Sequence, residues 1–183
     1  MAKEHSSRLI ELSILEYEKL KDEQIQRIGF RDNILYVTLV AVGGVISFAL
    51  GSVKTHSAML LVPWICIILG WTYIVNDEKI SSIGKYIRQK LEKRIQREAN
   101  LSETVLFGWE MEHRTDKKRF QRKILQCMID EIAFCLSGIF SVIAYIALDV
   151  PSSYMIIVGL VEIFLLLGLG IQLVLYADFE QGR

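Results

Sequence analysis

Residues 77–123 read DEKISSIGKYIRQKLEKRIQREANLSETVLFGWEMEHRTDKKRFQRK and separate two pairs of long apolar runs. The stretch carries 13 Lys and Arg against 8 Asp and Glu, a net charge of +5 in a chain whose formal charge is zero. The apolar runs on either side are about twenty residues long, which is the length that a helix needs to cross a bilayer. The stretch therefore predicts two transmembrane hairpins joined by a cationic segment outside the lipid.

The apolar runs favour helices over strands. Hydrophobic residues make up 52% of the chain and only two prolines interrupt it. The runs do not alternate between apolar and polar residues, as the strands of a membrane β-barrel do. We predict an all-α integral membrane protein with four transmembrane helices in two hairpins and long cytosolic amphipathic helices.

The predicted organisation has five parts, which follow the alternation of polar and apolar stretches. They are a cytosolic N-terminal helix at 1–32, transmembrane hairpin 1 at 33–76, a basic cytosolic helical segment at 77–123, transmembrane hairpin 2 at 124–176, and a cytosolic tail at 177–183.

The polar N-terminal part has the spacing of an amphipathic helix, with Ser6 or Ser7 as its predicted cap. One face carries Ile10, Ile14, Tyr17, Ile25 and Ile28. This apolar stripe needs a partner, for which there are two candidates: the other cytosolic helix or a neighbouring subunit.

A second amphipathic helix is predicted over 77–99. Its apolar stripe recurs every three or four residues, at Ile80, Ile83, Ile87, Leu91 and Ile95. We expect it to pack against the N-terminal helix, within or between subunits. The pattern breaks at Asn100, and a short further helix is predicted from Ser102 to His113.

The distribution of Lys and Arg predicts the orientation of the chain. The N-terminal part and the middle segment hold 19 of them, whereas the two short loops on the other side hold only Lys54. Positive residues stay on the cytoplasmic side of a membrane. Both termini and the polar middle segment are therefore predicted to face the cytoplasm.

Three acidic residues are candidates for a pore or an intramembrane polar site. Glu162 lies well inside the fourth apolar run, where a carboxylate is costly unless it is paired, protonated or in contact with water. It either lines a pore or handles protons, or it is neutral and bonds across an oligomer interface. Asp130 and Glu131 either pair with Lys123, Arg122 or another subunit at the inner interface, or form a cation-attracting ring at an inner pore mouth.

Gly43 and Gly44, with small neighbours, predict close helix packing in the first span. The three cysteines fall in or near apolar runs and are predicted to be buried thiols. No catalytic triad, phosphate-binding loop or metalloprotease helix occurs, so we expect no enzyme, no cofactor and no metal site. Glu110, Glu112 and His113 cannot all face one ion on a helix.

The basic segment has two interpretations. It sets the topology and contacts anionic lipid, or it binds an anionic nucleotide or single-stranded nucleic acid through cations and interleaved aromatic rings. The ligand-binding candidates are Trp109, Arg114, Lys117, Lys118, Arg119, Arg122 and Lys123.

Two stretches carry a resemblance, LGWTYIVNDEKISSIGKYIR at 69–88 and FGWEMEHRTDKKRFQRK at 107–123, together with GFRDN at 29–33. With them the chain resembles a family of small bacterial four-span membrane proteins. Its organisation is similar to that of the membrane effectors of anti-phage systems paired with a nucleotidyltransferase, of the Hailong type. In those systems a DNA oligomer made by the partner enzyme holds a channel shut until infection removes it.

The resemblance implies an oligomeric channel in the bacterial inner membrane, gated from the cytoplasm, that depolarises the membrane in anti-phage defence. The expected partners are other copies of the chain, with four subunits favoured, a DNA oligomer or nucleotide, a nucleotidyltransferase encoded nearby, and anionic lipids. The alternatives are a membrane scaffold that anchors a cytosolic partner and a small proton-coupled transporter that uses Glu162.

Overall fold

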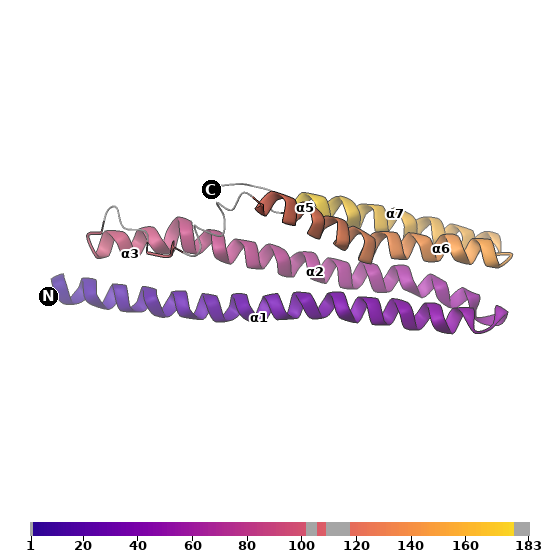
Figure 1. Cartoon of the computed structure of the whole chain (residues 1–183), viewed down its shortest axis with the longest axis horizontal. Coiled ribbons are helices and arrows are strands. Elements are labelled where there is room, and N and C mark those ends of the chain that lie inside the picture. The colour runs from indigo at the N-terminus through magenta and orange to yellow at the C-terminus, as the bar shows by residue number, and fades with distance from the viewer. Residues whose placement is uncertain (1, 102–105, 109–117, 178–183) are drawn as a thin grey trace. The chain divides into compact units, whose positions relative to one another are not determined.

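The computed structural model describes residues 2–101, 106–108 and 118–177, and within these ranges every regular element is a helix. The helices are α1 (Ala2–Leu50), η1 (Val53–Leu60), α2 (Leu61–Tyr86), η2 (Ile87–Leu91), α3 (Glu92–Glu98), α5 (Arg119–Asp130), η3 (Glu131–Leu136), α6 (Ser137–Leu148) and α7 (Ser153–Tyr176) (Figure 1). The all-α prediction is confirmed for this part of the chain.

Four helical stretches among the described residues are long and apolar enough to cross a membrane. They are Ser6–Leu50, Thr55–Glu98, Arg119–Leu148 and Ser153–Tyr176. Each overlaps one of the four predicted spans. The chain thus has the composition of a multi-pass membrane protein.

The chain divides into two compact units. The polar unit comprises residues 1–30, 76–121 and 178–183, and the apolar unit comprises residues 31–75 and 122–177. The division falls close to the predicted boundaries between polar and apolar parts of the sequence. Each unit is described separately below.

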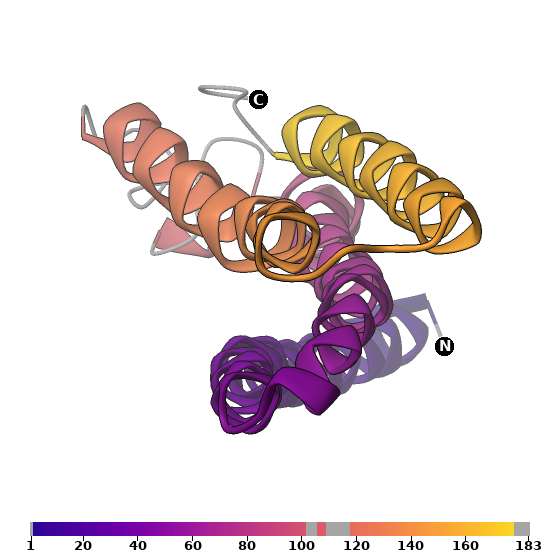
Figure 2. The ribbon, with the colours of Figure 1, turned by 90° about the vertical axis from the view of Figure 1, so that its right-hand side faces the viewer.

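The apolar unit is held together by close contacts at three glycines, whose missing side chains let neighbouring helices approach. A Cβ atom added to Gly70 of α2 would lie 2.8 Å from Leu169 of α7 and 3.3 Å from the Cβ atom of Phe134. Gly138 and Gly159 hold α6 and α7 together in the same way, because an added Cβ would lie 2.7 Å from Leu166 and 2.8 Å from Val142. Figures 1 and 2 show α6 and α7 running side by side from the turn that joins them.

The predicted packing at Gly43 and Gly44 does not occur within the chain. Both residues are exposed, and a Cβ atom added to either would meet nothing within 4 Å. The close approach is made by α2, α6 and α7 instead. The cysteines fit the prediction better, since Cys66 and Cys135 are buried and Cys127 is half-buried, and all three are free thiols.

The core of the polar unit is the apolar stripe that was predicted over 77–99. Ile83, Ile87, Leu91 and Ile95 are all buried, and Tyr17 and Leu20 of α1 pack against them. The predicted contact with the N-terminal helix is therefore confirmed within one chain. The helix does not start anew at Asp77, however, because α2 continues through it to Tyr86.

A wider π-helical turn, η2, carries the stripe onward from Tyr86. Residues that recur every four positions drift around an ordinary α-helix, which has 3.6 residues per turn. The i to i+5 hydrogen bonds of a π-turn reduce this drift. Ile87 and Leu91, the first and last residues of η2, are both 0% exposed.

The apolar stripe predicted on the N-terminal helix is only partly covered. Ile10 and Tyr17 are half-buried, whereas Ile14, Ile25 and Ile28 are 46%, 65% and 38% exposed. The face of α1 that is covered differs from the predicted stripe and includes polar residues, among them the buried Ser13.

In the polar unit, the start of α1 differs from the prediction, whereas the end of α3 agrees with it. Helix α1 begins at Ala2, so neither Ser6 nor Ser7 is its cap, and the Ser6 hydroxyl donates to the carbonyl of Glu98 at 2.7 Å. Asn100 does end α3: it has a φ of 53°, and the amide of Leu101 donates to Gln96 O at 2.9 Å, as in a Schellman motif. The further helix predicted at 102–113 falls almost wholly outside the described residues.

Candidate functional site

Glu162 lies on α7 in the interior of the apolar unit. It is 1% exposed, and neither carboxylate oxygen has a hydrogen-bond partner among the described residues. The indole of Trp64 on α2 lies nearby, but it does not reach hydrogen-bond geometry. In this conformation the carboxylate therefore faces the interior of its own chain, neither a surface that another subunit would cover nor an open aqueous path.

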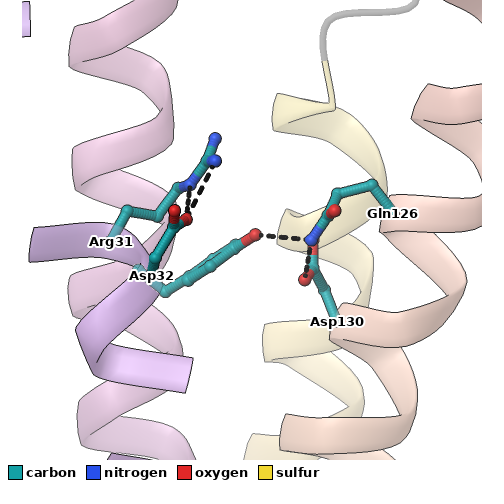
Figure 3. A network of polar contacts seen from close by, with 5 residues as sticks. Arg31, Asp32, Gln126 and Asp130 are labelled. Carbon is teal, nitrogen blue, oxygen red and sulfur yellow. Dashed lines mark hydrogen bonds and ion pairs between the residues drawn. The ribbon is translucent and has the colours of Figure 1, made fainter. Parts of the chain in front are cut away.

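Asp130 belongs to a polar contact that links two helices of the apolar unit (Figure 3). The Nε2 atom of Gln126 on α5 donates to Asp130 Oδ1 at 2.9 Å and to the hydroxyl oxygen of Tyr73 on α2 at 3.0 Å. Asp130 itself is 6% exposed. On α1, Arg31 donates to Asp32 Oδ1 at 3.1 Å, and Figure 3 includes this pair.

Glu131 points to a different neighbour, as expected for adjacent residues on a helix. It lies against Gly170 of α7, where an added Cβ atom would be 2.9 Å from its Oε2 atom. Glu131 also lines a groove of about 440 Å³ whose walls are otherwise apolar, among them Ile139, Leu166 and Val174. Asp130 and Glu131 do not share one surface, so a single ring of charge would contain only one of them.

Three side chains, from α1, the end of α2 and α3, form a cluster that holds the polar unit together. The hydroxyl of Tyr86 donates to Glu16 Oε1 at 2.6 Å, and Arg94 pairs with Glu16 Oε2 at 2.9 Å. Arg94 also donates to the Tyr86 hydroxyl oxygen at 3.2 Å. The hydrogen bond to the Glu16 carboxylate, with smaller contributions from burial and from the negative charge, raises the pKa of Tyr86.

The stretch 107–123, which contains the predicted ligand-binding residues, is attached to this unit at its start. Phe107 stacks on Tyr17 of α1 with ring centroids 4.2 Å apart. The preceding amide, of Leu106, donates to Glu92 Oε1 at 3.1 Å, and Glu92 is buried. Two independent contacts thus fix the chain just before Trp109.

The predicted ligand-binding residues fall into three groups. Lys118 and Arg122 are exposed and Lys123 is half-buried. Arg119 is 6% exposed, so its side chain is not presented to a ligand in this conformation. Trp109, Arg114 and Lys117 lie outside the described residues, as do Glu110, Glu112 and His113. Within the described ranges no group of three His, Cys, Asp or Glu side chains is placed to hold a metal ion.

Two features had escaped sequence reasoning. Lys93, Gln96, Arg97 and Asn100 line an open groove of about 510 Å³ at the end of α3. The clue in the sequence is the spacing of three, one and three residues, which places them around one helix end. His56, in η1, is 8% exposed, and its Nδ1 atom has no partner among the described residues. No sequence pattern marked it.

Comparisons with protein-family models, curated proteins and solved structures found no match. The class of the protein therefore rests on the fold alone: a helical chain with four apolar helices suited to a membrane. The resemblance to four-span membrane effectors remains a prediction.

Proposed function

We propose that the chain is a homo-oligomeric ion channel in a bacterial inner membrane. The cytoplasmic polar unit would sense an anionic nucleotide or single-stranded DNA oligomer and gate the channel. Opening would depolarise the membrane and stop growth, which is the outcome that anti-phage defence requires. The protein would act without catalysing a reaction.

The observation that supports a channel best is the solitary carboxylate of Glu162. An acidic side chain at membrane depth costs several kcal/mol unless it gains a partner or water. Its two oxygens are buried and lack hydrogen bonds among the described residues. In the proposal this group gains its partner in another conformation. In the proposal the described conformation is closed, and opening hydrates Glu162 so that it attracts cations.

The attachment of Phe107 supports gating from the cytoplasm. A ligand bound by the run that follows Phe107 would pull on the Tyr17 ring, and Tyr17 belongs to the same continuous helix as the first predicted span. Cations for phosphate and rings for bases are what a single-stranded nucleic acid needs. The exposed Lys118 and Arg122 supply charge of this kind.

The test is conduction by the purified protein in planar bilayers, with and without single-stranded DNA oligomers. We expect cation currents that the oligomers alter, and Glu162→Gln should change the conductance or the cation selectivity. Ser141→Ala, which removes a hydroxyl of the apolar unit bonded to Met59 O at 2.8 Å, is the matched control and should leave selectivity unchanged. Absence of current under every ligand condition would favour a membrane scaffold. Proton-coupled uptake without channel currents would favour a transporter.

A further inference from the structure

The two helices of the polar unit expose opposite charges. On α1 up to Phe30, five acidic side chains are exposed. Among the described side chains of the same stretch, only two cations are exposed, Arg8 and Lys19. The acids are Glu4, Glu11, Glu18, Asp22 and Glu23. Between residues 76 and 100 every exposed charged side chain is a cation: Lys79, Lys85, Lys90, Lys93, Arg94 and Arg97. One unit thus has an acidic face and a basic face.

The acidic face of α1 also carries apolar side chains. Glu4, Glu11, Glu18 and Asp22 recur at spacings of seven, seven and four, so they form one row along the helix. Ile14, Leu15 and Ile25 flank this row and are 46%, 50% and 65% exposed. Large apolar side chains exposed outside the membrane beside a row of like charge are typical of a protein interface.

We propose that this acidic face packs against the basic face, residues 79–97, of a second copy of the same chain. The occupant follows from charge: the acidic row repels phosphate and anionic lipid, and the basic face of another copy is its complement. Because each copy offers two different faces, the contact is heterologous, and it forms the ring that a channel requires when the rotation between copies closes. The inference rests on the homo-oligomer of the proposed function and specifies how the copies meet.

The contacts within one chain set the register between copies. Ser6 bonds to Glu98, Glu16 to Tyr86 and Arg94, and Gln24 donates to the carbonyl of Ile80 at 3.2 Å. Rotation about a ring axis preserves height along that axis. If α1 and the helix over residues 79–97 both run along the ring axis, residues that lie level within one chain also lie level between neighbouring copies. Glu11 then lies level with Lys93, and Glu18 with Lys85.

Cysteine cross-linking of the full-length protein in nanodiscs tests this register. With Cys127 replaced by Ala, Glu11→Cys combined with Lys93→Cys should give a ladder of covalent oligomers under mild oxidation. Neither single cysteine variant should give the ladder, because a heterologous contact does not bring identical residues together. Glu23→Cys with Lys93→Cys is the matched control, since Glu23 lies off the acidic row and pairs with Arg27 at 2.6 Å.

Charge reversal gives a second, independent readout. Glu11→Lys with Glu18→Lys should reduce the oligomeric fraction at least tenfold, and adding Lys93→Glu and Lys85→Glu should restore it. A ladder from single cysteines, or an unchanged oligomer after charge reversal, overturns the inference; the basic face would then be free for lipid or nucleic acid. Bilayer currents separate the two proposals. A ladder without current keeps the interface and rejects the channel, and current without a ladder does the reverse.

Discussion

The rings of Tyr17 and Phe107 are stacked, with their planes inclined by only 10° and their centroids 4.2 Å apart. The two residues come from segments far apart in the sequence, the N-terminal helix and the chain after Asn100. Aromatic pairs of this kind contribute about 0.5–1.5 kcal/mol beyond the area that they bury. The stack therefore helps to hold the start of the stretch 107–123, which contains the predicted ligand-binding residues, on α1.

Replacing either ring should weaken gating more than ligand binding. We expect Phe107→Leu to lower the free energy of unfolding by about 1 kcal/mol and to reduce the effect of DNA oligomers on current. Tyr17→Leu should cost more, because Tyr17 also packs against the buried stripe, and the double variant should lose less than the sum of the two single losses because the stack is removed in each. Additive losses in the cycle would contradict a coupling role for the stack.

Glu162 should cost stability while it serves the proposed conduction. Burying a polar group without a hydrogen bond costs about 1–3 kcal/mol in proteins. Glu162→Leu, which removes the carboxyl, should therefore raise the thermal midpoint of the protein in detergent and abolish the current. Ser141→Ala should shift the midpoint the other way, since it removes a buried hydrogen bond worth about 1 kcal/mol. A lower midpoint for Glu162→Leu would show that the carboxylate has a partner.

The sequence predicts the helices and the four long apolar stretches well, because both follow from hydrophobic period and length. It predicts contact faces less well. Ile14 and Ile25 fit the apolar period of the N-terminal helix, yet they are exposed, and the covered face holds Ser13 instead. The face that is covered depends on hydrogen bonds at a distance in sequence, such as Gln24 to Ile80, which no local pattern reveals. The environment of Glu162 was likewise out of reach, because it depends on how α2 and α7 pack.

Glycine positions show the same limit of sequence reasoning. Gly70→Ala should destabilise the protein by about 1–3 kcal/mol, because the new methyl group meets Phe134 and Leu169 in a packed interior. Gly44→Ala has the same chemistry but meets no atom within 4 Å, so the thermal midpoint should stay unchanged or rise. Chemical unfolding in mixed micelles measures both variants. Equal losses would mean that Gly44 is covered in the assembled protein.

The hydrogen bond between Tyr86 and Glu16 predicts an alkaline loss of stability. The pKa of Tyr86 is raised in the folded chain, so the phenol releases its proton less readily than in the unfolded chain. The stabilisation that this hydrogen bond gives the folded chain is complete below the pKa of Tyr86 in the unfolded chain, about 10. It disappears as the pH rises through the pKa of Tyr86 in the folded chain. The midpoint difference between the wild type and Tyr86→Phe should therefore be constant from pH 7 to about 9 and shrink above about 10. A difference that stays constant to about pH 11 would contradict the bond.

The basic residues near the third predicted span should separate into ligand contacts and structural supports. Lys118 and Arg122 are exposed, so replacing both with Gln should weaken binding of single-stranded DNA, and the thermal midpoint should fall only by the small amount that surface interactions contribute. Loss of two phosphate contacts should also reduce the slope of log K against log salt by about 1.4. Arg119 is 6% exposed, and Arg119→Gln should instead lower the midpoint, with the salt slope unchanged for the folded fraction. Fluorescence anisotropy over a salt series measures both. If Arg119→Gln alone flattens the slope, Arg119 leaves its buried position to bind the ligand, and the sensing segment rearranges on binding.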